Sequence, residues 1–233
     1  MSQLPLAFEH RPALGAEDFL VAAPNREAVL WLDRWPDWPA PALAIHGPPG
    51  CGKTHLAHVF RARSGADLVA AGEIGVALAA AARATPRALA IDDADEALAD
   101  ETAFLHLHNL IAGAGGHLLI TARDAPARWG IALPDLRSRL SAAPAVALRP
   151  PDDELLAAVL AKQFSDRQLR VGDDVRRFLL ARMERSFDAA RRIVAALDRA
   201  ALAGRRNITV PLAREVLAAL GGDNGQDQDQ GRT

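Results

Sequence analysis

The segment 43–54 constrains the fold of this chain more than any other part of its sequence. A short apolar run, typical of a buried strand, leads into the pattern G-x-x-x-x-G-K-T, and apolar residues at helical spacing follow it. Glycines in such a loop let backbone N–H groups turn towards a phosphate, and the N-terminus of the next helix adds partial positive charge. The pattern therefore predicts a nucleotide-binding site between a strand and a helix.

The side chains of this loop indicate how a nucleotide would be held. Lys53 is expected to reach the β- and γ-phosphates, and the Thr54 hydroxyl to ligate Mg²⁺. Lys162 is the only other lysine in the chain, and a compact ammonium suits a phosphate cradle better than a guanidinium does. Cys51, beside Lys53 at a helix N-terminus, should favour the reactive thiolate, and an inert buried thiol is the alternative. The loop residues expected to contact nucleotide are Pro48, Gly50, Cys51, Gly52, Lys53, Thr54 and His55.

Further strand and helix patterns alternate along the chain up to the proline pair 150–151. Besides the strand ahead of the loop, apolar runs typical of strands occupy 67–71, 88–91, 117–121 and 145–148. Helical stretches separate these runs, as in a parallel sheet that carries helices on both faces. The expected fold is therefore α/β, with a five-stranded parallel sheet flanked by helices.

After the proline pair the pattern changes to helices alone, which predicts a small all-α domain whose third helix stops at Gly204. We expect an α/β base domain over 13–149 and a helical lid domain over 150–220. The segment 1–12 should be an extended peptide without an evident strand partner, because Pro5 and Pro12 disfavour helix. The polar tail 221–233 is expected to be disordered.

Composition excludes several classes of protein. The net charge of −2 gives no overall attraction to nucleic acid, and no basic helix suited to reading DNA bases is evident. The single cysteine excludes an internal disulfide and fits a reducing compartment. The first ten residues lack the pattern of a signal peptide, and no apolar run is long enough to span a membrane. These features predict a soluble cytoplasmic protein without direct sequence-specific DNA binding.

Two further strand ends carry side chains that suit a nucleotide site. The run 88–91 ends in Asp92 and Asp93, and the run 117–121 ends in Thr121. At the carboxyl edge of a parallel sheet, Asp92 would hold Mg²⁺ through water and Asp93 would face the γ-phosphate. The Thr121 hydroxyl would polarise a hydrolytic water. Each signal is weak alone and gains weight from the phosphate loop.

Arginines outside the loop allow two interpretations each. Arg139, in the run 136–140, is either part of a solvated basic turn or a finger aimed at the γ-phosphate of a neighbouring subunit. Arg191, or alternatively Arg192, stands in the third helix of the small domain, where a cation could close that domain onto the nucleotide. An isolated surface arginine without such a role is the plainer interpretation.

Taken in this order, these elements resemble the AAA+ ATPases, and most of all the branch that contains the bacterial replication initiator DnaA. The segments 19–25, 104–110 and 187–197 are similar to the adenine-side segment, the helix after the acidic strand and the sensor-2 helix of that branch. The resemblance implies ATP or ADP with Mg²⁺ as ligands. It also implies that Thr121 is sensor 1, Arg139 the arginine finger and Arg191 the lid sensor. Phe19 and Val21 would contact the nucleotide.

The N-terminal segment 3–8 resembles the Gln-Leu-x-Leu-x-Phe peptide by which bacterial proteins dock on the DNA sliding clamp. Gln3 would supply an orienting hydrogen bond, and Leu4, Leu6 and Phe8 would be apolar anchors for a groove. The alternative is an arm that packs on its own domain. A shortened initiator core with a clamp peptide is the layout of the Hda branch, whose members inactivate the initiator.

The resemblance therefore implies a regulator that docks on the clamp and stimulates ATP hydrolysis by DnaA in trans. Its own ATPase activity should be weak, because Asp93 is shorter than the Glu of many AAA+ motors. A helicase loader or another autonomous ATPase is the main alternative. The working ligand, ATP or ADP, and the formation of a homo-oligomer stay open at this point.

Overall fold

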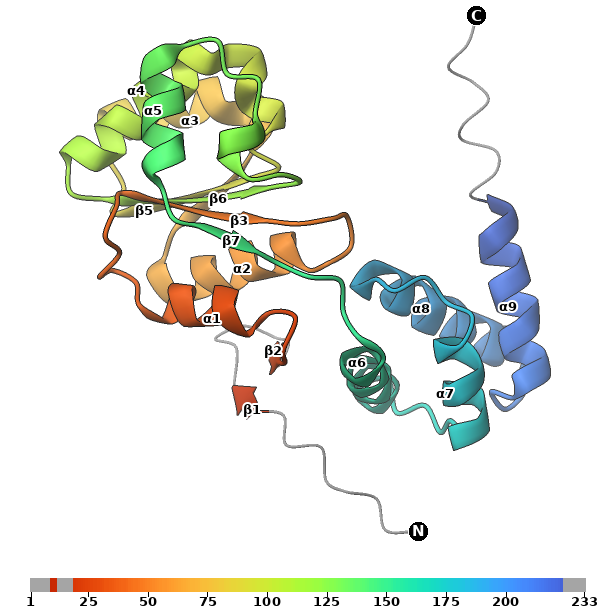
Figure 1. Ribbon diagram of the computed structural model, residues 1–233. Helices are drawn as coiled ribbons and strands as arrows, with labels where there is room; N and C mark the ends of the chain where they lie inside the picture. Colours follow the sequence, from red (N-terminus) through yellow and green to blue (C-terminus); the bar gives the residue numbers. More distant parts are fainter. Residues whose placement is uncertain (1–8, 12–18, 224–233) are drawn as a thin grey trace, which may run out of the picture. The chain divides into compact units, whose positions relative to one another are not determined.

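The computed structural model describes residues 9–11 and 19–223, and the chain divides into two compact units, 1–150 and 151–233 (Figure 1). Two hydrophobic clusters form the core of the first unit, and a third forms the core of the second. Each unit therefore has a buried interior of its own, as expected for a separate domain.

The first unit is built on a five-stranded sheet with the order β4-β5-β6-β3-β7. All of its strand pairs are parallel, which confirms the predicted sheet. The order places β6 between the strand that precedes the phosphate loop and the strand that ends in Asp92. The strands are β3 (Ala42–His46), β4 (Asp67–Ala70), β5 (Ala88–Asp92), β6 (His117–Ala122) and β7 (Ala145–Ala147).

Helices cover both faces of this sheet (Figure 1). One face carries α1 (Arg26–Asp33) and α2 (Lys53–Ser64), and the other carries α3 (Ile74–Arg83), α4 (Glu101–Gly113) and α5 (Pro134–Ala142). Short 3-10 turns, η1 (Ala71–Glu73), η2 (Glu96–Asp100) and η3 (Pro126–Arg128), join these elements. Successive strand residues point to opposite faces, so Leu43 and Ile45 pack on the α1–α2 side and Ala44 on the other.

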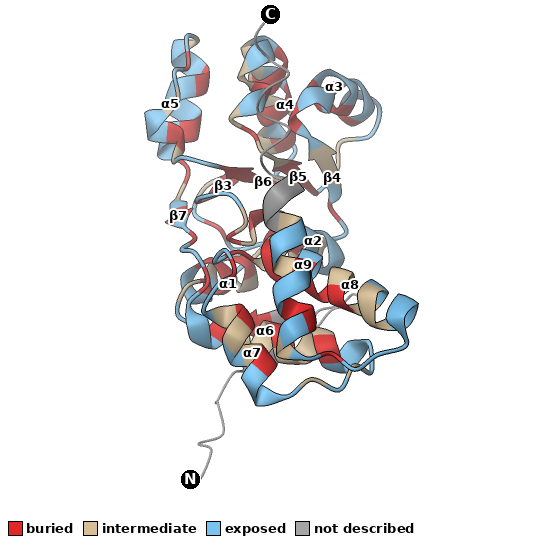
Figure 2. Ribbon diagram, turned by 90° about the vertical axis from the view of Figure 1, so that its right-hand side faces the viewer, coloured by how far each residue is buried: buried red, intermediate tan, exposed pale blue. Residues whose placement is uncertain are grey.

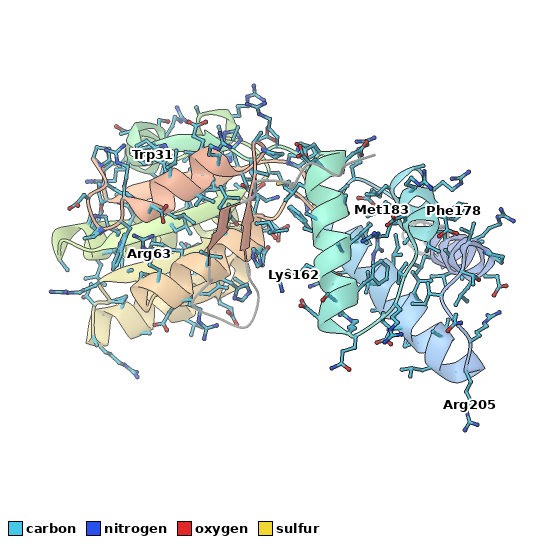
Figure 3. The ribbon with its side chains drawn as sticks, turned by 90° about the horizontal axis from the view of Figure 1, so that it is seen from below. Trp31, Arg63, Lys162, Phe178, Met183 and Arg205 are labelled. Atoms are coloured by element: carbon cyan, nitrogen blue, oxygen red, sulfur yellow. The ribbon has the colours of Figure 1, made fainter. Side chains whose placement is uncertain are left out.

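An aromatic cluster fills the core between α2 and the segment after α1. The Phe60 ring is fully buried, stacks on Trp38 at 5.4 Å between centroids and meets Trp35 edge-on at 5.9 Å. Trp38 donates its indole N–H to the carbonyl oxygen of Trp31 at 2.8 Å. At the far end of α2, Arg63 donates to the carbonyl oxygen of Asp33 at 2.7 Å, which ties α2 to the end of α1 (Figure 3).

Residues 9–11 are paired, contrary to the expectation that the segment 1–12 has no evident strand partner. Strand β1 (Glu9–Arg11) pairs antiparallel with β2 (Phe19–Val21). Asn25 then fixes the turn from β2 into α1, because its side chain accepts from Ala22 N–H at 2.8 Å and donates to Leu20 O at 2.9 Å. Residues Gln3, Leu4, Leu6 and Phe8 of the expected clamp peptide lie outside the described residues.

The second unit consists of α6 (Asp153–Asp166), α7 (Asp173–Leu180), α8 (Phe187–Gly204) and α9 (Val210–Asp223), as far as it is described. Their apolar stripes face inward, where buried residues gather (Figure 2). Side-chain caps fix two of the helix starts: Asp152 accepts from Leu155 N–H at 2.8 Å, and Ser186 accepts from Ala189 N–H at 3.1 Å.

Two helix ends in this unit differ from the expectations. Gly204 belongs to α8, and the left-handed residue that follows the helix is Arg205, with φ 45° (Figure 3). Helix α9 continues through Gly221 and Gly222 to Asp223, into the segment expected to be disordered, and residues 224–233 lie outside the described part.

Among the residues that the structure describes, no helix combines the length and apolar character that crossing a membrane requires.

Replacing Phe60 by Ala should lower the free energy of unfolding by about 3–5 kcal/mol, because the change empties a fully buried ring position. Urea unfolding followed by tryptophan fluorescence measures this loss. Leu30→Ala on α1 is the matched control, since Leu30 is 53% exposed and should change stability by no more than about 0.5 kcal/mol. Equal losses in the two variants would contradict the placement of Phe60 at the centre of this core.

Candidate functional site

The loop between β3 and α2 has a backbone that depends on three glycines for two different reasons. Gly50 and Gly52 adopt φ of 72° and 102°, a left-handed region that side chains rarely tolerate. Gly47 has no such φ. A Cβ on Gly47 would lie 2.3 Å from the carbonyl oxygen of Leu148 and 3.0 Å from the Cys51 sulfur. Gly47 is therefore required because the backbone of Leu148, just after β7, lies directly against it. The sequence pattern did not reveal this contact.

Lys53 is buried in this loop and forms no ion pair with a carboxylate of the described residues. Its Nζ donates to the carbonyl oxygens of Gly47 at 2.8 Å and Pro48 at 3.1 Å. Within the described part of the chain no carboxylate forms an ion pair with it. A buried ammonium ion is costly unless an anion accompanies it. The position therefore fits a phosphate, which would supply the missing charge.

Three backbone donors of the loop are also free to bind an anion. In the described residues, the backbone N–H groups of Gly50, Gly52 and Thr54 take part in no hydrogen bond. Thr54 is exposed, so its hydroxyl can reach a metal ion. Pro48 is exposed and His55 half-buried. The loop thus offers a cation, backbone donors and a hydroxyl on one short segment, as a phosphate cradle requires.

Hydrogen bonds join the acidic end of β5 to β6 through Thr121. The Thr121 hydroxyl, which is fully buried, donates to Asp92 Oδ1 in a short hydrogen bond and accepts from the Asp93 N–H at 3.1 Å. The Ala94 N–H donates to the Thr121 carbonyl oxygen at 2.7 Å. The structure therefore brings Asp92, Asp93 and Thr121 together. The hydroxyl is engaged by protein groups, and its role towards a hydrolytic water stays a prediction.

Asp93 is held in an unfavourable setting. Its φ is 51°, a left-handed conformation that Asp tolerates better than most residues do. Burial raises the pKa of its carboxyl above the usual value, the neighbouring Asp92 raises the pKa further, and Lys53 opposes both. The Lys53 ammonium and this pair of carboxylates therefore belong to one electrostatic site.

The expectation of a reactive Cys51 is wrong. Cys51 is 2% exposed, and burial raises the pKa of its thiol, although Lys53 pulls the pKa the other way. Desolvation outweighs the nearby positive charge because the sulfur packs inside the loop against Gly47. The residue therefore supports the shape of the loop.

The structure separates the two arginines of α5. Arg137 donates from Nε to the carbonyl oxygen of Ile131 at 3.0 Å, and its Nη2 bonds to the same oxygen. Arg139 is exposed and has no hydrogen bond or ion pair with any residue that the structure describes. Burial lowers the pKa of His108 on α4, and the positive charge of Arg139 lowers that pKa further. Arg139 is thus a free guanidinium near α4.

The residues expected to contact nucleotide from elsewhere are dispersed. Val21 lies in the core beside α1 and α2, and Phe19 belongs to β2. Arg191 pairs with Asp188 at 2.5 Å on α8, and Arg192 approaches the same carboxylate at 3.2 Å. The Arg191 side chain is 70% exposed and that of Arg192 45% exposed. The choice of Arg191 as lid sensor stays a prediction.

A protein-only metal site is absent from the described residues, where no three His, Cys, Asp or Glu side chains gather suitably. Mg²⁺ is commonly held by one or two protein oxygens together with nucleotide phosphates. Thr54 and Asp92 suit that arrangement, since each offers an oxygen at the carboxyl edge of the sheet.

Comparison with known proteins gives a family match for the second unit and a likeness of fold for most of the chain. Residues 152–217 match the family described as Hda, lid domain. Domain III of the Thermotoga maritima replication initiation protein DnaA superposes with a TM-score of 0.76 at 18% identity, covering 90% of this chain and 98% of that one. This likeness and the lid match confirm the predicted fold class and the family resemblance.

Two nucleotide-bound structures are also similar. A replication initiator DnaA bound to AMPPCP and single-stranded DNA gives a TM-score of 0.64 at 15% identity, covering 81% of this chain and 66% of that one. AMPPCP-bound DnaA from Aquifex aeolicus gives 0.58 at 18% identity, covering 71% of this chain and 59% of that one. This chain thus spans about two thirds or less of those proteins, and at these identities the likeness concerns the fold.

Replacing Asp93 by Asn should stabilise the protein at neutral pH. The folded-state pKa of Asp93 is raised, so its ionisation costs stability once the pH exceeds the ordinary carboxyl pKa, and the full cost applies above the raised pKa. Below the ordinary pKa both states are protonated and the gain from Asn should vanish. Urea unfolding of both proteins between pH 3 and pH 8 measures the difference, and a gain independent of pH would contradict this assignment.

Cys51 in the native protein should react with maleimide at least about tenfold more slowly than a free thiol at pH 7, because burial restricts access and disfavours the thiolate. Its labelling rate should rise with pH. The same protein unfolded in urea supplies the control, since its thiol is then ordinary. Similar rates in the native and unfolded states would show that the thiol is accessible after all.

Proposed function

We propose that this chain, which resembles the DnaA/Hda branch of the AAA+ proteins in its lid and its fold, regulates chromosome replication by stimulating ATP hydrolysis on the initiator DnaA. The observation that carries this proposal is the free, exposed guanidinium of Arg139 on α5. The proposal also includes binding of ATP or ADP with Mg²⁺ and docking on the DNA sliding clamp.

Nucleotide binding by the chain itself is supported by the loop after β3. Lys53 would meet the β- and γ-phosphates, the free backbone N–H groups would surround them, and Thr54 and Asp92 would hold Mg²⁺. A bound nucleotide supplies the negative charge that the buried ammonium lacks. AMPPCP in two of the similar DnaA structures supports this role for the fold.

Hydrolysis by the chain itself should be slow. Asp93 has a shorter side chain than the Glu of many AAA+ motors, so its carboxylate reaches less far towards a water molecule. The Thr121 hydroxyl is committed to Asp92 and to the backbone of Asp93. The chain's main contribution is therefore to a site on another molecule.

That contribution is an arginine finger. A guanidinium supplied in trans stabilises the charge that develops on the transferred phosphoryl group, an effect of roughly 10³–10⁵ in rate. A finger must be exposed and unengaged in the free protein. Arg139 meets both conditions among the described residues, whereas Arg137 is bound to Ile131.

Clamp docking completes the proposal and is supported by the sequence alone. Gln3, Leu4, Leu6 and Phe8 match a clamp-binding peptide, and a clamp loaded on DNA would bring this protein to DnaA at newly replicated DNA. Docking raises the local concentration of the finger near its target.

Arg139→Ala should fold, bind ADP and bind the clamp as the unmodified protein does, yet fail to stimulate ATP hydrolysis by DnaA on clamp-loaded DNA. The expected loss is at least about 10³-fold in the stimulated rate. Arg139→Lys should fail as well, because an ammonium lacks the planar fork of donors. Phosphate release by DnaA is the measurement.

Arg83→Ala provides the matched control, since Arg83 is also exposed, lies in the last turn of a helix and has no ion pair or hydrogen bond in the described residues. It should leave stimulation unchanged. Normal stimulation by Arg139→Ala would refute the finger. ATP hydrolysis by this chain alone that increases with single-stranded DNA would favour a helicase loader instead.

A further inference from the structure

We infer that Glu101 and Arg137 are positioning residues that clamp the turn 131–133 and so set the direction of the helix that presents Arg139. This inference rests on the proposed function, because it assigns a role in presenting the finger. Neither residue touches the loop that would bind nucleotide.

Glu101 holds the turn by its backbone donors. One carboxylate oxygen accepts from Ala132 N–H at 2.7 Å, and the other accepts from Leu133 N–H at 2.6 Å. Hydrogen bonds of this length to a carboxylate are about twice as strong as neutral ones. Glu101 itself is fixed in the first turn of α4, which Asp100 caps by accepting from Ala103 N–H at 2.9 Å. The helix N-terminus favours its negative charge.

Arg137 holds the same turn by its acceptor. Its guanidinium donates through Nε and Nη2 to the Ile131 carbonyl oxygen, six residues back along its own chain. The Ile131 side chain is 1% exposed and packs in the core between the sheet and α4. The turn is therefore fixed by a buried side chain, by its carbonyl group and by two consecutive N–H groups.

The helix that follows has few other contacts to orient it. Helix α5 begins at Pro134 after Leu133, which provides no side-chain cap. Leu136 and Leu140 are its buried residues, and they lie on one stripe. One stripe fixes the distance of a helix from its support but allows it to tilt and slide. The hydrogen bonds of Glu101 and Arg137 at the N-terminus of α5 remove that freedom. Arg139 lies in the last turn, where a tilt of the helix displaces a side chain most.

Precise placement matters for a finger, because misplacing a catalytic group by about 1 Å can cost on the order of 10² in rate. A positioning role differs from a merely stabilising one in what it changes. Loss of the Glu101 or Arg137 hydrogen bonds to the turn should lower the maximal stimulated rate of ATP hydrolysis by DnaA. It should leave the concentration of this chain that gives half-maximal stimulation, and its affinity for ADP, unchanged. General destabilisation would lower the amount of active protein and affect every measurement alike.

The experiment compares Glu101→Ala, Glu101→Gln, Arg137→Ala and Arg137→Lys with the unmodified full chain. Hydrogen exchange of the backbone in 129–143 reports how firmly the turn 131–133 is held, and urea unfolding reports stability. ATP hydrolysis by DnaA on DNA that carries the sliding clamp reports the action of the Arg139 finger. Glu154→Gln is the matched control, because Glu154 occupies the first turn of α6, is exposed and accepts no hydrogen bond from the residues that the structure describes.

The Ala variants should exchange faster at 132 and 133 and lose on the order of 10² in the maximal stimulated rate. Glu101→Gln and Arg137→Lys should lose less, since each keeps one of two hydrogen bonds. Unchanged hydrogen exchange in Glu101→Ala would overturn the role of Glu101 in holding the turn. Faster exchange with normal stimulation, while Arg139→Ala is inactive, would overturn the positioning role and leave the proposed function intact. Normal stimulation by Arg139→Ala would overturn both.

Discussion

The parallel pairing of β6 with β3 on one side and β5 on the other determines where every polar group of the site lies. Thr121 stands opposite Ile45 in that register. Ile45 is the last residue but one of β3, the strand that precedes the phosphate loop. From there its hydroxyl reaches Asp92 and the backbone of Asp93 on the neighbouring strand. The loop and the carboxylates meet at one sheet edge because all three strands run in the same direction.

This arrangement keeps like charges together and leaves a cation without its counter-ion. Burial and the neighbouring Asp92 disfavour the ionisation of Asp93, and Lys53 donates its ammonium hydrogen bonds to carbonyl oxygens. Both features cost stability in the protein without a ligand. The proposed magnesium nucleotide, an anion accompanied by a divalent cation, would offset both. Functional sites often carry such a cost, since the groups are arranged for the ligand.

The features that could be predicted from the sequence are those set by neighbours along the chain. The phosphate loop, the five strands and the helical second unit each follow from a local pattern, and all were found. Features set by distant partners were missed. Glu101 bonds to residues 31 and 32 positions away, and no periodicity marks such a pair. The β1–β2 pairing and the burial of Cys51 likewise depend on packing that spacing does not encode.

The contact between Gly47 and Leu148 has a mechanical consequence. A single methyl group at residue 47 would collide with the Leu148 carbonyl oxygen. Any larger residue in the loop there would therefore displace the segment that follows β7. Leu148 also donates its N–H to the His46 carbonyl oxygen at 2.7 Å, so the two backbones are linked as well as touching. The boundary between the two units follows directly, after Pro150. Any rearrangement of the loop at Gly47 upon ligand binding would therefore displace Leu148, two residues before that boundary.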